Sequence, residues 1–154
     1  MSFNIEELQK ATNELFSKMS WKQHIVKGLC MTQIPGDPSS ADGDKLRGVF
    51  WTKPDSTGQE VQRENKVDES QYTEFVDEFK GTYFELVYKW LSAKYKLGRF
   101  RLLLLEPRTS LSWHRDPEPR LHIPIMTNPG AHLCIDDTLK HLPADGSVWF
   151  TDTR

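Results

Sequence analysis

The sequence predicts an α+β fold in which two helical segments accompany a C-terminal part made of short β-strands. Apolar residues recur at helical spacing between positions 5 and 19, and a longer helical pattern runs from 71 to about 97. After Gly98, six short runs rich in β-forming residues follow one another, divided by Pro, Gly, Asn and Asp. These predicted strands are 100–107, 110–114, 120–127, 131–136, 138–142 and 147–151. Short, evenly spaced strands with no helical pattern between them favour a β-sandwich or barrel.

The first helix is expected directly after Asn4, because an asparagine side chain is a favourable N-cap. Glu6 and Glu7 then lie in the first turn, where negative charge suits the helix dipole. The apolar residues of this helix are Ile5, Leu8, Ala11, Leu15 and Met19. Their spacing predicts one buried face.

The segment between the two helical patterns should alternate strands and loops. Short strands are expected at 28–34 and 46–52, where β-forming residues gather. The residues at 35–44 and 53–70 are rich in Pro, Gly, Asp, Ser and charged side chains, which is typical of loops.

The pattern from 71 to 97 predicts one helix of six or seven turns. Its aromatic residues, including Phe75, Phe79 and Trp90, are expected to pack against the sheet as core residues. Gly81 costs about 1 kcal/mol relative to alanine in a helix interior and would mark a bend. Trp149, in the last predicted strand, should pack inside the sandwich.

Length and composition predict a single domain, with residues 1–97 as helical support and loops and residues 98–154 as the β-rich core. The chain has 20 Lys and Arg against 22 Asp and Glu, so no charge excess favours nucleic acid or anionic lipid as a partner. Cys30 and Cys134 lie far apart and outside any C-x-x-C motif, which indicates free thiols in a reducing cytoplasm. The longest purely aliphatic run, 102–105, is too short to cross a bilayer.

The stretch SWHRDPEPRLHIPI, residues 112–125, places charged residues within a β-like segment. Alternate residues of a strand share a face, so His114 and Asp116 should point the same way, about 6.5 Å apart along the backbone. After the PEP turn, one face carries Arg120, His122 and Pro124, and the opposite face carries Leu121, Ile123 and Ile125. The second face is expected to fill a hydrophobic core.

Charged side chains on a concave sheet face are costly to bury unless a partner or a metal compensates them. His-x-Asp supplies two of the three ligands of the facial triad of non-haem Fe(II), made of two histidines and one carboxylate. His114 and Asp116 are therefore candidate metal ligands, and the remaining histidine should come from a distant strand.

Three motifs carry a resemblance to a known family: HRD, then RLHIPI, then LPADGSVWFTDT near the end of the chain. Together they resemble the double-stranded β-helix (jelly-roll, cupin-like) core of Fe(II)- and 2-oxoglutarate-dependent oxygenases, nearest the aspartyl/asparaginyl β-hydroxylase branch. The resemblance extends from Phe100 to the last residue. It implies a dioxygenase that uses iron, 2-oxoglutarate and molecular oxygen to hydroxylate an amino-acid side chain, free or in a polypeptide.

The resemblance also implies roles for individual residues. His114 and Asp116 match the first metal histidine and the metal carboxylate, and both are the expected catalytic residues. Arg120 and His122 match the Arg-x-His pair that lies beside the cosubstrate in this branch, where a guanidinium can engage a carboxylate through two hydrogen bonds. In the family, a second metal histidine and a basic residue that binds 2-oxoglutarate follow the G-x-x-W strand. We expect them beyond Arg154, together with the last strands of the core.

Simpler interpretations of the same residues remain open. His114 and Asp116 would also make an ordinary hydrogen-bonded pair, Arg120 a salt bridge to Asp116 or Glu118, and His122 a core histidine bonded to a backbone carbonyl. Solvent-facing positions are expected for the other histidines, which are His24, His132 and His141. The alternative function is a catalytically inactive cupin-like module that binds a small acid or sugar, or another protein.

Overall fold

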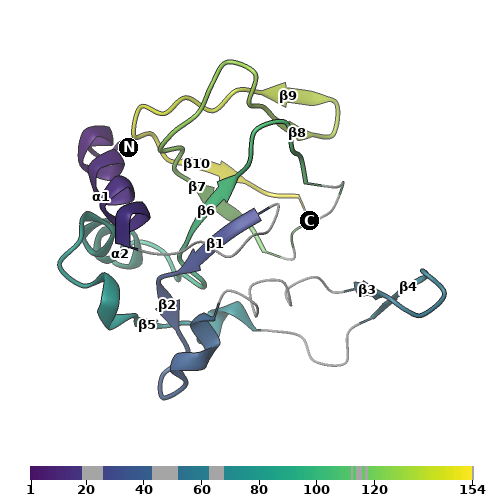
Figure 1. Cartoon of the computed structure of the whole chain (residues 1–154), viewed down its shortest axis with the longest axis horizontal. Helices are drawn as coiled ribbons and strands as arrows, with labels where there is room; N and C mark the ends of the chain where they lie inside the picture. The colour runs from purple at the N-terminus through teal and green to yellow at the C-terminus, as the bar shows by residue number, and fades with distance from the viewer. Residues whose placement is uncertain are drawn as a thin grey trace. The chain divides into compact units, whose positions relative to one another are not determined.

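The computed structural model describes residues 1–18, 26–42, 52–62, 68–111, 113, 116 and 118–153 (Figure 1). These residues form a mixed α+β structure of two α-helices and small antiparallel sheets. The chain divides into two compact units, Met1–Met19 with Trp113–Arg154, and Ser20–Ser112. The α+β class predicted from the sequence is confirmed.

Helix α1 spans Ile5–Lys18 and begins where its capping residue predicts. The Asn4 Oδ1 atom accepts hydrogen bonds from the backbone amides of Glu6 and Glu7, at 2.9 and 3.2 Å. These bonds satisfy two of the amides that the first turn leaves without helical partners. The buried positions of the helix are Leu8, Ala11, Thr12 and Leu15. The predicted apolar face is therefore confirmed at its centre.

The second helix is much shorter than predicted. Helix α2 spans only Tyr83–Ser92, whereas the sequence pattern predicted one helix from 71 to 97. Gly81 has a φ of +78°, in the left-handed region, and this residue lies just before the helix begins. The single-helix prediction is wrong because such a backbone conformation cannot continue a right-handed helix, so Gly81 separates two structures rather than bending one.

The residues before Gly81 form short turns of 3-10 helix, η3 (Glu69–Gln71) and η4 (Asp77–Phe79), with strand β5 (Glu74–Phe75) between them. Phe75 and Phe79 are nevertheless buried, and the ring of Phe75 stacks on that of Tyr88 with centroids 5.0 Å apart. The predicted burial is therefore confirmed for Phe75 and Phe79, which lie in a strand and a 3-10 turn, whereas Trp90 on helix α2 is only half-buried.

The described residues of the unit Ser20–Ser112 form three antiparallel strand pairs. In two of them, strand β1 (Val26–Cys30) pairs with β6 (Arg101–Leu105), and β2 (Thr32–Gln33) pairs with β5. These pairs confirm β-structure within the predicted runs at 28–34 and 100–107. Residues 35–42, the described part of the predicted loop at 35–44, include the 3-10 turn η1 (Pro38–Ala41) and belong to no named strand. The loop prediction is confirmed for these residues.

A hairpin occupies part of the second predicted loop. Strand β3 (Thr52–Pro54) pairs with β4 (Glu60–Gln62), inside the segment expected to be irregular. Asp55 Oδ1 accepts hydrogen bonds from the amides of Thr57 and Gln59, and Gly58 has a φ of +83°. The polar residues therefore form the turn of a hairpin. Apart from Thr52, the predicted strand at 46–52 lies outside the described residues.

The core of the unit Ser20–Ser112 is apolar and contains one ion pair. Its most deeply buried large side chains include Met31, Phe79, Phe84, Val87 and Leu91, each at most 3 % exposed. Arg99 Nη2 lies 2.8 Å from Glu69 Oε1, with side chains 1 % and 5 % exposed. A guanidinium and a carboxylate buried this deeply must be paired with each other.

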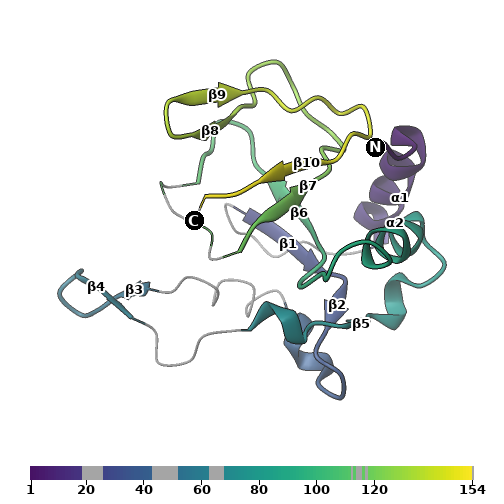
Figure 2. The same ribbon diagram turned by 180° about the vertical axis from the view of Figure 1, so that it is seen from behind.

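In the unit Met1–Met19 with Trp113–Arg154, the described residues form two strand pairs. Strand β7 (Arg120–His122) pairs with β10 (Trp149–Thr151), and β8 (Leu133–Ile135) pairs with β9 (Thr138–Lys140). Figure 1 and Figure 2 show each pair side by side from opposite directions. Four of the six predicted C-terminal strands, counting β7, are thus found in this unit, although β7 is shorter than its predicted run of 120–127.

The chain N-terminus is joined to the turn before β10. The amide of Phe3 donates to Gly146 O at 2.8 Å, and Ser2 and Ser147 form an isolated antiparallel bridge. Gly146 has a φ of +80°, and a Cβ atom there would lie 1.9 Å from Phe3 O. Only glycine fits this position, so the glycine of the G-x-x-W motif has a structural reason of its own.

The described residues form no closed barrel, and every sheet among them has two strands. The predicted strand at 110–114 is wrong for its described positions, because residues 110, 111 and 113 are not in a strand. No helix within the described ranges has the length and apolar character needed to span a membrane.

Candidate functional site

The candidate site lies on the pair of strands β7 and β10. In their register, Arg120 is opposite Thr151, and His122 is opposite Trp149. Opposed residues of an antiparallel pair share a face, so the predicted Arg120 and His122 face also carries an aromatic ring and a hydroxyl. Leu121 is opposite Phe150 on the other face.

The face predicted to be apolar core is only half-buried. Leu121, Ile123 and Ile125 all have intermediate exposure, and Phe150 beside Leu121 is 65 % exposed. The Arg120 side chain, on the polar face, is only 15 % exposed. The core prediction for this face is therefore wrong among the described residues, because a two-stranded sheet has no facing layer of its own to cover the apolar side.

Asp116 and Arg120 are brought together as an ion pair. Arg120 Nη2 lies 3.3 Å from Asp116 Oδ1 and 3.5 Å from Glu118 Oε2. The Asp116 backbone amide also donates to Thr153 Oγ1 at 3.0 Å, which attaches this loop residue to the segment that follows β10. The salt bridge considered as the simpler interpretation of Arg120 is thus present, with both of the acids considered.

His122 forms a hydrogen bond to a side chain of the neighbouring strand, a contact not considered from the sequence. Its Nε2 atom lies 2.8 Å from Thr151 Oγ1 in a hydrogen bond between neighbouring strands. Sequence reasoning missed Thr151 and Thr153 as site residues. The alternation of the final Thr-Asp-Thr was the available signal, because residues two apart in an extended chain share a face.

Trp149 is oriented by a short polar chain. Its indole Nε1–H donates to Ser147 Oγ at 2.8 Å, and Lys140 Nζ lies 5.4 Å from the ring centroid. The hydroxyl and amide of Ser147 bond to Asp145 and lower the pKa of that carboxyl below its ordinary value. Trp149 is half-buried. Its predicted place inside a sandwich stays a prediction, because the described residues form only two-stranded sheets.

The first predicted metal ligand, His114, lies outside the described residues, and so does His24. Among the residues that the structure describes, no group of three or more His, Cys, Asp and Glu side chains is arranged to hold a metal ion. Asp116 is therefore the one proposed iron ligand whose surroundings are described. His132 is exposed, as predicted, whereas His141 is half-buried.

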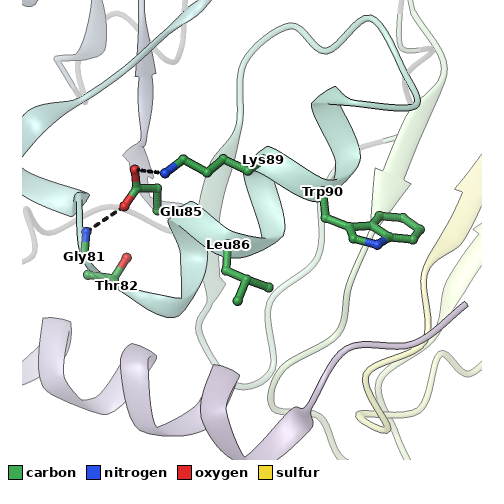
Figure 3. Close-up of a pocket in the computed structure, with 6 residues that line it drawn as sticks. All are labelled: Gly81, Thr82, Glu85, Leu86, Lys89 and Trp90. Atoms are coloured by element: carbon green, nitrogen blue, oxygen red, sulfur yellow. Dashed lines mark hydrogen bonds and ion pairs between the residues drawn. The ribbon is translucent and has the colours of Figure 1, made fainter.

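A shallow hollow of about 540 Å³ lies elsewhere, along helix α2 in the unit Ser20–Ser112 (Figure 3). Its polar groups are paired with one another: Glu85 accepts a hydrogen bond from the Gly81 amide at 2.8 Å and lies 2.7 Å from Lys89 Nζ. These contacts lower the pKa of Glu85, the Lys89 ammonium contributing most. No predicted site residue lines this hollow.

No family model matches the chain, and no curated protein gives a significant match to it. The resemblance to 2-oxoglutarate oxygenases therefore depends on the three sequence motifs and on where their residues lie. Asp116 of the first motif contacts Arg120 of the second and Thr153 of the third, and His122 of the second contacts Thr151 of the third. The contacts to the third motif join residues 29 and 37 positions apart, whereas Asp116 and Arg120 are only four positions apart.

Proposed function

We propose that the protein is an Fe(II)- and 2-oxoglutarate-dependent dioxygenase that hydroxylates an amino-acid side chain, free or in a polypeptide. The observation that carries the proposal is the meeting of the three motifs in one network around Asp116, Arg120 and His122. The double-stranded β-helix implied by the resemblance belongs to the same proposal. Because Cys30 and Cys134 are free thiols, we place the activity in the cytoplasm.

The donor atoms suit iron. His114 and Asp116 would hold the ion with a further histidine, and imidazole with carboxylate is the ligand set of non-haem Fe(II) oxygenases. When bound, the iron supplies the oxidising chemistry with oxygen and 2-oxoglutarate. Arg120 would fix the orientation of the Asp116 carboxylate, in the way that hydrogen-bonded neighbours orient metal ligands.

Charge sets the order in which the ligands bind. The described cluster joins two carboxylates, Asp116 and Glu118, to one guanidinium, Arg120, and so has an excess of one negative charge. A dianionic cosubstrate is repelled by such a cluster, whereas a divalent cation is attracted and reverses its sign. We therefore expect 2-oxoglutarate to bind well only after the metal has bound.

The alternative is a catalytically inactive cupin-like binding or interaction module. One observation favours it. Arg120 is paired with two acids of the chain itself and His122 with Thr151, so these side chains have hydrogen-bond and ion-pair partners within the protein. Such a module would show no iron-dependent binding of 2-oxoglutarate.

Anaerobic titration of the full chain with Fe(II) and 2-oxoglutarate separates the two functions. The enzyme should develop the weak visible charge-transfer band of the ternary complex, and 2-oxoglutarate should bind at least about tenfold more weakly without metal. His114→Ala and Asp116→Ala should abolish the band. Asp137→Ala is the matched control, since this exposed acid lies in the β8–β9 turn.

The proposal fails if the wild-type chain gives no band at saturating iron and 2-oxoglutarate. It also fails if the band survives Asp116→Ala unchanged. Turnover provides the second readout: consumption of oxygen and formation of succinate should depend on His114 and Asp116. Arg120→Lys keeps the charge but loses the planar fork, so we expect a higher KM for 2-oxoglutarate.

A further inference from the structure

Two imidazoles face each other at the open end of the β8–β9 hairpin, a part of the chain not used by the proposed oxygenase chemistry. His132 precedes β8, and His141 follows β9. The register Leu133↔Lys140 places these two histidines opposite each other at the next position of the ladder. Their ring centroids are 5.9 Å apart, with planes inclined at 66°.

Each ring is fixed in one tautomer by the backbone. His132 Nδ1 lies 3.1 Å from Gly130 O, and His141 Nδ1 lies 2.8 Å from Ala131 O. A carbonyl oxygen only accepts hydrogen bonds, so Nδ1 carries the proton of each neutral ring. The lone pair is then on Nε2 in both rings. A backbone carbonyl bonded to Nδ1 is the usual second partner of a metal-binding histidine.

We propose that His132 and His141 bind one divalent transition-metal ion, such as Zn²⁺, through their Nε2 atoms. Zinc–nitrogen bonds of about 2.0–2.1 Å place two imidazoles of a tetrahedral site with centroids about 5 Å apart. The observed centroid separation of 5.9 Å is slightly longer, so the two rings must move closer together by less than the width of one ring. Small side-chain rotations at the exposed His132 provide that movement.

The neighbouring side chains are compatible with a cation at this place. Lys140 shares its face with Leu133, which is opposite to the face of the two histidines, and its ammonium lies 5.4 Å from the Trp149 ring centroid. Cys134 is exposed two residues from His132, yet the described residues form no three-ligand group with it. The site therefore has two protein ligands, and water or another small donor completes the coordination.

The test is a Zn²⁺ titration by calorimetry of the full chain carrying Asp116→Ala, which removes the carboxylate of the proposed iron site. We expect one Zn²⁺ per chain, and at least about tenfold weaker binding after either His132→Ala or His141→Ala. Cys134→Ser and His24→Ala are controls that should leave the affinity within twofold.

Nitrogen NMR of the imidazole rings tests the geometry independently of affinity. On addition of Zn²⁺, the Nε2 resonances of both rings should shift strongly while both Nδ1 atoms remain protonated. Equal Zn²⁺ affinity of the Asp116→Ala chain with and without the histidine substitutions would overturn the proposal, and so would a shift at Nδ1 in place of Nε2. Loss of binding in Cys134→Ser would overturn the two-imidazole ligand set.

Discussion

The unit Ser20–Ser112 and the segment 113–153 are built on different principles. The first has an apolar core, with Met31, Val87 and Leu91 at 0–2 % exposure. In the described part of the second, no large apolar side chain is buried, and Trp113 and Phe150 are 79 % and 65 % exposed. Its described side chains are joined by polar contacts such as Arg120–Asp116 and His122–Thr151. Deep apolar burial is therefore found in the first region and not in the described part of the second.

The two regions contain one kind of interaction in two environments, an arginine paired with a carboxylate. Arg99 and Glu69 are almost fully buried, whereas Asp116 beside Arg120 is 33 % exposed. A buried pair cannot lose one partner without leaving an isolated charge, while a solvated pair can. We therefore expect the loss of the Asp116 carboxylate to cost less folding stability than the loss of the Glu69 carboxylate.

The largest expected difference between the two regions is in the free energy of unfolding that is lost when the carboxylate of each ion pair is removed. We expect Glu69→Gln to lower the free energy of unfolding by about 3–5 kcal/mol, because Arg99 already has Nε and Nη1 without hydrogen-bond partners among the described residues. Asp116→Asn should cost about 1 kcal/mol or less, since Glu118 remains beside Arg120. Urea denaturation of both variants measures the difference. Equal losses would contradict it.

On helix α2, truncating a buried apolar side chain should lower the free energy of unfolding more than truncating an exposed one. This difference should be smaller than the one between the two ion pairs. Leu91 is 2 % exposed and Leu86 is 52 % exposed on the same helix. Leu91→Ala should destabilise by about 2–5 kcal/mol, because it removes buried contacts and leaves a cavity. Leu86→Ala should cost less than about 0.5 kcal/mol. Thermal unfolding of the pair tests this, and a large loss for Leu86→Ala would show that its face is covered.

The fold was predictable where short-range signals agree. The N-cap, acidic first turn and apolar spacing together fixed helix α1. The helix from 71 to 97 was not predictable in the same way, since aromatic periodicity reports burial and not backbone conformation. Gly81 was read as a bend, but its positive φ is a property of the folded chain that composition does not show. The strands of the hairpin, Thr52–Pro54 and Glu60–Gln62, are mostly polar, so no apolar pattern in the sequence predicts them.

For the candidate site, the sequence indicated which residues gather but not their partners. Arg120 and Asp116 form an ion pair, as the simpler interpretation of Arg120 predicted, whereas the resemblance placed Arg120 beside the cosubstrate. Thr151 and Thr153 were missed because the pairing of β10 with β7 is a long-range fact. The role of His114 as a metal ligand stays a prediction, because that residue lies outside the described part of the chain.

Removing the hydrogen bond of His122 should lower the free energy of unfolding moderately, whereas a matched change elsewhere in the same region should not. Thr151→Val keeps the β-branched shape and removes the hydroxyl 2.8 Å from His122 Nε2, so we expect a loss of about 0.5–1.5 kcal/mol. Thr138→Val is the matched control on the exposed strand β9 and should be nearly neutral. A shifted His122 Nε2 resonance in the first variant alone would confirm the contact, and identical behaviour of the two variants would refute it.

The smallest expected effect concerns the two cysteines, one in each region. Burial raises the pKa of the Cys30 thiol above its ordinary value, whereas Cys134 is exposed. A thiol whose pKa is raised by folding contributes its full stability below the unfolded pKa of about 8.5, and that contribution is lost as the pH rises through the folded pKa. The free energy of unfolding of Cys134→Ser should therefore fall at alkaline pH as in the wild type, whereas Cys30→Ala should lack this component.

Labelling with iodoacetamide at pH 8 measures the difference between the two thiols directly. One thiol per native chain should react, and the labelled peptide should contain Cys134. The reason is that the thiolate is the reactive form and that Cys30 is only 3 % exposed. Rapid labelling of Cys30 in the native chain would show that the apolar region opens as readily as the polar one.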